Sequence, residues 1–396
     1  MLAAKSGVLL TNYIPPYRLP LFRSIASEFG AFKVLESFPM APDRPWTAQH
    51  DGLQVETQNT FTFKRIGKHP VGFRDRGYVH VPCDTLGRLN RIKPDIILSS
   101  ELGARTVQAA AYRFLHPNCR LIMWAGLSEH TEKGRGHARE TLRRAVLPFS
   151  DAVLVNGASA ARYVQGLGVP QNKLFVTLDT TDHTQFIDLM LERKPSEQHR
   201  LLYLGRLIER KGLGPFISVL SLWCSEHPKQ SVEFWLVGDG PQREPLERIP
   251  LPQNLRLRWC GNFAHAEMAA FYSQAGICAF PSFSDEWGMV VNEAMAAGLP
   301  VLGSIYSQAV EHLVRDGVTG WTFRPDHRDE MYAAVSGALT TPIVKLQQMR
   351  VTARNQVKHL TSDFVASRVM EAVHFVQRDK RGCASVVADE SLRGHR

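Results

Sequence analysis

Two carboxylates and a glycine within residues 285–293 form the pattern with the clearest chemistry in this sequence. Apolar residues recur at helical spacing from Gly288, so Asp285 precedes a helix and Glu293 lies roughly 7–8 Å along its axis. Such a helix start presents unpaired N–H groups and a positive dipole end, which favour a phosphate group. The carboxylates could then hold hydroxyl groups at two places on one ligand. Alternatively, Asp285 and Glu286 are ordinary first-turn acids and Glu293 is a solvated helix position.

A second charged loop follows the apolar segment 199–204. Gly205 permits close approach of the backbone to a ligand, Arg206 offers a fork of donors, and Lys211 offers a compact ammonium group. Two cations on one loop near a helix start suit a diphosphate. An exposed basic turn is the alternative interpretation.

Strand and helix patterns alternate along the chain, which is typical of parallel α/β sheets. One repeat consists of an apolar strand at 277–280, a loop, the helix from Gly288 and a strand at 301–303. The first half shows the same alternation, beginning with a strand at 7–11. Residues 180–200 lose this periodicity and become polar, which indicates a linker. A chain of 396 residues therefore predicts two α/β domains.

Loops of the first half supply candidates for binding a second substrate. Ligands of α/β domains bind at the carboxyl ends of strands, and the polar loop after the strand at 121–124 contains His130. This histidine is the natural titratable group to meet a substrate hydroxyl, and an ordinary surface histidine is the alternative. The other candidates on such loops are Asn12, Tyr17, Arg18 and Arg135.

The first half is also the basic half. Residues 1–190 contain 23 Lys/Arg and 16 Asp/Glu, a net charge of +7, whereas the rest contains 24 and 22, a net charge of +2. Such a surface suits anionic lipid headgroups or a phosphorylated carrier, with a plain basic surface as the alternative. The stretch 62–76 concentrates this charge among aromatic residues, and its composition favours a solvated loop over a membrane or substrate contact.

Several classes of function are not expected. The sequence lacks nucleic-acid-binding motifs, and its six cysteines and fifteen histidines form no metal-ligand pattern. We therefore expect neither a nucleic-acid partner, nor a metal, nor a tightly bound cofactor. A composition of 44% hydrophobic and 21% charged residues, without a signal peptide or membrane-spanning run, predicts a cytoplasmic protein that could contact the inner face of the membrane.

Residues 280–304 resemble the donor-binding signature of retaining glycosyltransferases of family 4. In that signature an acidic residue, seven further residues and a Glu bracket an aromatic residue followed by Gly. In register, Asp285 takes the place of the first acid, Trp287 and Gly288 form the aromatic–glycine pair, and Glu293 is the second acid. Asp replaces the usual Glu, so Glu286, one residue out of register, is the reserve candidate.

The resemblance implies roles for these residues. The first acid would contact the donor sugar, the helix amides around Met289 and Val290 would contact sugar and phosphate, and the second acid would hold the ribose hydroxyls. Gly205, Arg206 and Lys211 resemble a further family element, whose Arg and Lys contact the donor diphosphate.

The fold implied by the resemblance is the GT-B arrangement, with two Rossmann-like domains facing across a cleft. We expect an acceptor-binding domain at 1–183, a linker at 184–199, a nucleotide-sugar-binding domain at 200–360, a last helix at 361–378 that could cross back to the first domain, and a disordered tail at 379–396.

The activity implied by the resemblance is retaining transfer of a sugar from a nucleoside diphosphate to an acceptor hydroxyl, without a metal. A UDP-sugar is the first choice of donor and GDP-mannose the second. The acceptor would be a glycan or a lipid-linked molecule, as in polysaccharide or lipopolysaccharide assembly. The alternatives are a catalytically silent nucleotide-sugar-binding protein, and an epimerase or phosphorylase of the same architecture.

Overall fold

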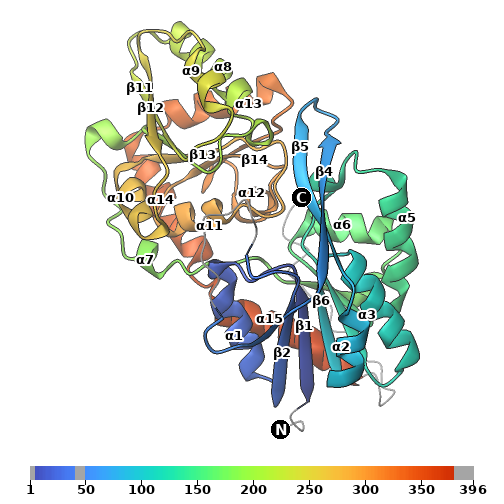
Figure 1. The fold of residues 1–396 in the computed structure, drawn as a ribbon. Helices are drawn as coiled ribbons and strands as arrows, with labels where there is room; N and C mark the ends of the chain where they lie inside the picture. The colour runs from blue at the N-terminus through green and yellow to red at the C-terminus, as the bar shows by residue number, and fades with distance from the viewer. Residues whose placement is uncertain (1–4, 41–49, 379–396) are drawn as a thin grey trace.

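A computed structural model describes residues 5–40 and 50–378 of the chain (Figure 1). The tail at 379–396, which its composition predicts to be disordered, lies outside these residues.

The first half contains a seven-stranded sheet in which every neighbouring pair of strands is parallel. Its order is β3-β2-β1-β6-β7-β8-β9. The strands are β1 (Ser6–Thr11), β2 (Ala31–Glu36), β3 (Gln54–Thr57), β6 (Ile96–Ser100), β7 (Arg120–Ala125), β8 (Ala152–Val155) and β9 (Leu174–Val176). The helices of this half are α1 (Leu19–Ser27), α2 (Thr85–Ile92), α3 (Ala104–Leu115), α4 (Glu129–Glu132), α5 (His137–Val146) and α6 (Ala158–Gly166).

The second half contains a six-stranded parallel sheet of order β12-β11-β10-β13-β14-β15. The strands are β10 (Leu201–Leu204), β11 (Val232–Val237), β12 (Leu255–Gly261), β13 (Ile277–Phe280), β14 (Val301–Ser304) and β15 (Gly320–Phe323). The helices are α7 (Thr184–Ile187), α8 (Leu213–Glu226), α9 (Arg243–Glu247), α10 (Met268–Gln274), α11 (Met289–Ala296), α12 (Gln308–Leu313), α13 (Arg328–Thr340) and α14 (Ile343–Val357). The prediction of two parallel α/β domains is confirmed.

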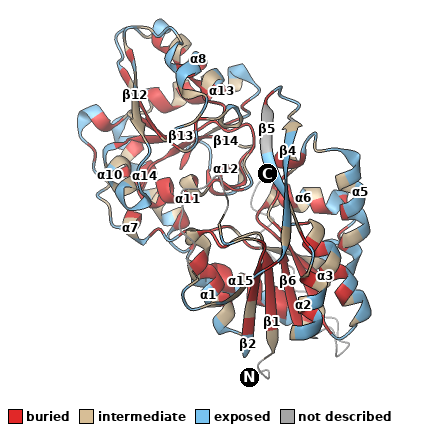
Figure 2. Ribbon diagram, viewed as in Figure 1, coloured by how far each residue is buried: buried red, intermediate tan, exposed pale blue. Residues whose placement is uncertain are grey.

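The central strands of each sheet are buried on both faces, as their red colour in Figure 2 shows, whereas the edge strands β3, β9 and β12 are partly exposed. In β1, for example, Val8 and Leu10 pack in one hydrophobic cluster and Leu9 packs in another. Burial on both faces explains why these strands are continuous apolar runs, and it fixes the loops at the strand ends on rigid supports.

The strand order reverses once in each sheet. In the first sheet the chain runs outward from β1 through β2 to β3, and then returns to place β6 beside β1. In the second sheet it runs from β10 to β12, and then returns to place β13 beside β10. Ligands of open α/β sheets bind outside the carboxyl ends of strands at such reversal points. The turns after β1, β6, β10 and β13 are therefore the positions to inspect.

The stretch 62–76 is not the solvated loop that its charge suggested. It belongs to an antiparallel hairpin of β4 (Thr60–Lys68) and β5 (Arg74–Pro82), in which Phe63 pairs with Val79. Apolar and polar residues alternate over residues 60–64 at the start of β4, a period of two that is typical of a strand. In Figure 1 the hairpin extends from the N-terminal half toward the C-terminal half, where Phe73 packs against Phe283 with ring centroids 6.0 Å apart.

Further contacts join the two halves. Gln308 of α12 donates its amide to the carbonyl of Leu127 at 2.9 Å, while its side-chain oxygen accepts from the amide of Ala160 at 3.0 Å. The last helix, α15 (Ser362–Arg378), packs against α1 and beneath β7 to β9. Its Val365 and Val369 belong to the same buried cluster as Leu9 of β1.

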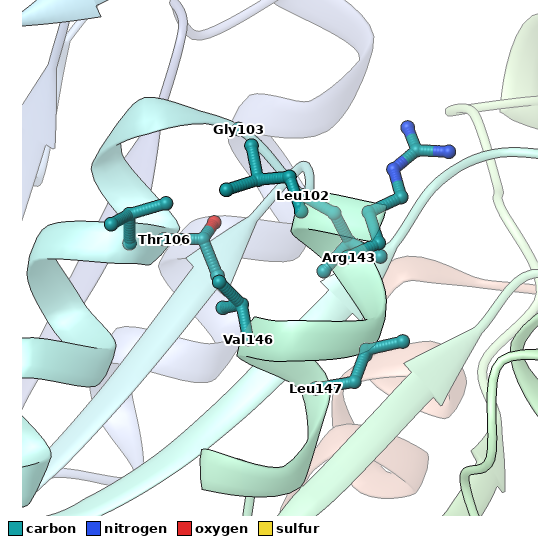
Figure 3. Close-up of a pocket in the computed structure, with 8 residues that line it drawn as sticks. Leu102, Gly103, Thr106, Arg143, Val146 and Leu147 are labelled. Carbon is teal, nitrogen blue, oxygen red and sulfur yellow. The ribbon is translucent and has the colours of Figure 1, made fainter. Parts of the chain in front are cut away.

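A small hollow between α3 and α5 is not a ligand site (Figure 3). Leu102, Val146 and Leu147 line it, and the guanidinium group of Arg143 points away from it. Its volume is about 10 Å³, which admits no more than one water molecule.

Candidate functional site

The strand reversal in the second sheet brings two charged loops together. Lys211, in the loop after β10, forms an ion pair with Asp285, in the loop after β13, and both side chains are largely buried. Backbone packing fixes this pairing, since a side chain added at Gly212 would place Cβ 2.2 Å from the carbonyl oxygen of Pro281. Two residues that the sequence placed in separate motifs therefore form one group.

Helix α11 begins where the sequence predicts. Gly288 is its N-terminal cap with a φ of 109°, and an added Cβ would lie 2.6 Å from Ser307 Oγ and 3.1 Å from the ring of Phe280. Only glycine fits this backbone and this space. Met289 and Val290 are half-buried in the first turn, so their amide groups lie at the helix end beside Asp285.

The aromatic ring of Trp287 does not face this group. Its indole is 2% exposed and donates to Asn292 Oδ1 at 2.8 Å. The ring packs in the core of the second half, so Trp287 could reach a ligand only through its backbone. Its carbonyl is already engaged, because it accepts from the amide of Ala309 at 3.0 Å.

The neighbouring acids Asp285 and Glu286 differ in their ionisation at neutral pH. Burial alone would raise the pKa of Asp285, but the charges of Lys211 and Arg210 and the hydrogen bond from Lys211 hold it below its ordinary value. Glu286 is exposed at its surface, but desolvation by the surrounding protein raises its pKa to about 7. The negative charges of Glu101 and Asp285 add to this effect, while Arg210 and Arg135 oppose it. Asp285 is therefore ionised at neutral pH, whereas Glu286 is near its titration midpoint.

Glu293 is not the solvated helix position of the alternative interpretation. It is 8% exposed, and its carboxylate accepts a hydrogen bond of 2.8 Å from the hydroxyl of Tyr272. His265 Nε2 lies 3.3 Å from its other oxygen, and this contact raises the pKa of His265. A buried, oriented carboxylate one and a half turns into α11 can accept hydrogen bonds from ligand hydroxyl groups.

Close backbone packing and a side-chain hydrogen bond fix the conformation of the loop after β10. Gly205 has a φ of 146°, and the hydroxyl of Tyr203 donates to the carbonyl of Arg206 at 2.8 Å. Gly238, in the loop after β11, packs so closely that an added Cβ would lie 2.0 Å from the carbonyl oxygen of Gly205. Arg206 itself is exposed.

His130 lies in a short helix, α4, and not in the irregular loop that the sequence suggested. Ser128 caps this helix through its hydroxyl, which accepts from the amide of Thr131 at 3.1 Å. The imidazole stacks on Tyr306 from the second half, with centroids 3.9 Å apart, and the amide of Asp285 donates to the carbonyl of the same tyrosine. Burial lowers the pKa of His130 to about 4, so the ring is neutral at physiological pH.

The remaining first-half candidates lie in different surroundings. Asn12, directly after β1, bonds to Glu101, directly after β6, and to Arg105 of α3. Arg18 forms a two-bond ion pair with Asp179, with distances of 2.7 and 2.8 Å, and Tyr17 lies in the same 3-10 turn.

Arg135 lies 3.6 Å from the carboxylate of Glu132, and its carbonyl accepts from Arg65 of the hairpin. The residues singled out from the sequence therefore do not form one cluster in the first half.

Two residues near this site escaped the sequence analysis: Glu101 and Arg210. Arg210 directly precedes Lys211, and a third cation in that loop was a visible signal. Glu101 was harder to find, because its proximity to the site depends on which strands are neighbours.

Among residues 5–40 and 50–378, no group of three or more His, Cys, Asp or Glu side chains is arranged to hold a metal ion. Within the same residues, no helix has both the length and the apolar character needed to cross a bilayer.

The site lies in a segment that matches a known family. Residues 198–341 match the family model described as glycosyl transferases group 1. This segment contains β10 to β15 and both charged loops.

Curated relatives are similar in sequence to this chain over part of their length. A glycogen synthase of Mycobacterium tuberculosis is 32% identical over 166 residues, which are 41% of this chain and 38% of that protein. The sulfoquinovosyl transferase SQD2 of Arabidopsis thaliana is 26% identical over 261 residues, which are 61% of this chain and 49% of that protein. The matched regions thus span half or less of each relative.

Solved structures resemble nearly the whole chain. The lipopolysaccharide outer core galactosyltransferase WaaB, in its apo form, superposes with a TM-score of 0.68 at 11% identity over 93% of this chain and 99% of that one. HepE of Anabaena in complex with UDP gives a TM-score of 0.67 at 16% identity, with 93% and 99% of the chains covered. The fold is therefore GT-B, as the sequence resemblance predicted.

Proposed function

We propose that this protein transfers a hexose-type sugar from a nucleoside diphosphate to a hydroxyl group of a glycan or lipid-linked acceptor, with retention of configuration. The observation that carries the proposal is the pairing of Lys211 with Asp285 directly before the N-terminus of α11. A cation and a helix dipole suit a departing diphosphate, while an ionised carboxylate suits positive charge at the sugar ring.

The geometry supports a role for each residue of the site. Arg206 and Lys211 contact the diphosphate, together with the backbone of Gly205 and the amides of Met289 and Val290 at the start of α11. Glu293 holds the ribose hydroxyls, and Asp285 orients the sugar. His130 is neutral, so it positions groups by hydrogen bonding and does not deliver a proton at physiological pH.

For the donor we propose a UDP-sugar first and GDP-mannose second. The support is that HepE, which shares this fold, is described in complexes with UDP and with UDP-glucose. The similarity in fold to WaaB supports a place in the assembly of lipopolysaccharide or another surface polysaccharide. We propose no metal in the reaction, because the cations of the chain and the helix end can carry the diphosphate charge.

The test is a thermal-shift screen with UDP, GDP, ADP and CDP. A ligand that binds only the native state raises its apparent stability as RT ln(1 + [L]/Kd), about 2.7 kcal/mol at a hundredfold excess over Kd. We expect a shift with UDP that is lost in Arg206→Ala. The exposed Arg248 of the second half, which pairs with Glu244, provides the control variant Arg248→Ala, in which the shift should persist. Absence of a shift with all four nucleotides would contradict the proposal, and binding without transfer would indicate a silent scaffold.

We further propose that the first half contacts an anionic membrane surface through the hairpin. Phe61 and Phe63 of β4 are 65% and 57% exposed, and Val79 of β5 lies opposite Phe63 on the same face. Lys64 and Arg65 are exposed on the same strand. Exposed aromatic side chains beside cations are a combination that binds the headgroup region of anionic bilayers.

Cosedimentation with vesicles tests this contact. The double variant Phe61→Ser, Phe63→Ser should bind vesicles of phosphatidylglycerol and phosphatidylcholine at least tenfold more weakly than the unaltered protein. Phe114 of α3 lies outside the hairpin and is 70% exposed, so Phe114→Ser removes an exposed ring of the same kind elsewhere and should leave binding unchanged. Equal loss in both variants, or none in either, would refute the assignment.

A further inference from the structure

The strand reversal in the first sheet carries a carboxylate that the proposed function does not yet use. Glu101 directly follows β6, and Asn12 directly follows β1, which is its neighbour in the sheet. This is the same position in the first sheet that Lys211 and Asp285 occupy in the second. It is also where open α/β sheets bind ligands.

The backbone at Glu101 is held in an unfavourable conformation. Its φ is 67°, and among the described residues only Lys93 shares a positive φ without being glycine. Lys93 ends helix α2, where left-handed residues are common, but Glu101 ends a strand. The amide of Glu101 donates to the carbonyl of Trp124 at 3.0 Å, which holds the turn in place. Non-glycine residues with a strained, left-handed backbone conformation occur preferentially at functional sites.

A hydrogen-bonded chain orients the Glu101 side chain. Arg105 is 3% exposed and donates to Ser37 Oγ at 2.7 Å and to the side-chain oxygen of Asn12. Asn12 in turn donates its amide to one carboxylate oxygen of Glu101. The second terminal nitrogen of Arg105 is buried and has no hydrogen-bond partner among the described residues. A buried guanidinium that bonds only neutral oxygens stabilises a carboxylate next to it.

The charge of Glu101 acts on a residue of the second half. Glu101 is exposed, and its charge contributes to the raised pKa of Glu286, which follows Asp285 in the donor signature. It also acts on Arg18. Glu101 therefore lies within electrostatic range of the loop before α11, although the two belong to different halves of the molecule.

We propose that Glu101 binds the acceptor, accepting a hydrogen bond from the acceptor hydroxyl group that faces the donor sugar. Asn12 and Arg105 are positioning residues that fix the carboxylate. The inference rests on the proposed glycosyl transfer, and it assigns the acceptor a hydroxyl donor at this point. An ionised carboxylate accepts such a bond more strongly than a neutral group does.

The experiment compares Glu101→Gln with Glu101→Asp, using UDP-glucose as donor and a panel of alkyl glycosides as acceptors. Water can also accept the sugar, so donor hydrolysis reports on the donor site without the acceptor. We expect Glu101→Gln to lower kcat/KM for the acceptor about 10- to 100-fold, the usual value of a hydrogen bond to a charged group. Hydrolysis of UDP-glucose and binding of UDP should stay within about twofold, and Glu101→Asp should restore part of the transfer.

Lys93 provides the matched control for backbone strain. Lys93→Gly relieves the other positive φ, so it should raise Tm slightly and leave transfer unchanged. Equal transfer by Glu101→Gln and the unaltered protein would overturn the inference, as would parallel loss of transfer and hydrolysis. If the unaltered protein neither binds UDP nor hydrolyses UDP-glucose, the proposed function itself fails, and the inference fails with it.

Discussion

Asp285→Asn is expected to lower the rate of sugar transfer by about 10²- to 10³-fold, while leaving the affinity for UDP equal to or higher than that of the unaltered protein. The rate falls because removal of a preorganised charge from the site of a developing opposite charge typically costs this much. The affinity does not fall because Asp285 neutralises Lys211 in the free protein. Without that carboxylate, the ammonium group of Lys211 is more available to a diphosphate.

Steady-state kinetics with UDP-glucose and calorimetric titration with UDP measure the two effects separately. The control is Glu247→Gln, which removes the acid of the exposed ion pair with Arg243 on α9 and should change neither quantity. A large loss of UDP affinity in Asp285→Asn would contradict this account of the ion pair. Unchanged transfer would remove Asp285 from the reaction, and Glu286 would become the acid to test.

Gly288→Ala is expected to destabilise the protein by about 2–4 kcal/mol and to weaken UDP binding at the same position. The cost has two parts. A φ of 109° is unfavourable for alanine, and the new Cβ would lie 2.6 Å from Ser307 Oγ. Ser307 also donates its hydroxyl to the carbonyl of Trp287, so the loop cannot move aside without breaking that bond.

The variant Gly317→Ala measures the cost of the backbone conformation without the cost of close packing. Gly317 has a φ of 67°, but an added Cβ would meet no atom within 4 Å. Gly317→Ala should therefore cost only the backbone part, about 1–2 kcal/mol, and leave UDP binding intact. Denaturant unfolding followed by circular dichroism measures both variants. Equal destabilisation would show that close packing at the start of α11 adds nothing.

Local signals were sufficient to predict much of the second half. The apolar run before Pro281, the glycine at 288 and the proline at 300 are short-range features. They predicted a strand, a helix from about Gly288 and a following strand, and the structure contains all three. Gly205 and the cations of its loop were equally visible. Such features act through backbone conformation and hydrogen bonding over a few residues, so the sequence expresses them directly.

The first half was harder to predict because its site residues depend on long-range pairing. The histidine at 130 was expected in an open loop, yet its ring stacks on Tyr306, which is far away in the chain. The segment that forms the hairpin of β4 and β5 was predicted to be a solvated loop because of its high charge, although the alternation of residues at its start indicated a strand. Glu101 was not singled out, since neither its positive φ nor its contact with Asn12 can be read from neighbouring residues.

The sequence alone determined the kinds of element, the helix start at Gly288 and the residue types able to bind a phosphate and hydroxyl groups. Only the tertiary structure decided which of them meet. Strand order places β13 beside β10 and β6 beside β1, and these neighbours bring Lys211 to Asp285 and Asn12 to Glu101. The physical reason is that hydrogen bonding and side-chain burial between distant segments select strand order in a parallel sheet. Those energies have no counterpart in the local pattern of residues.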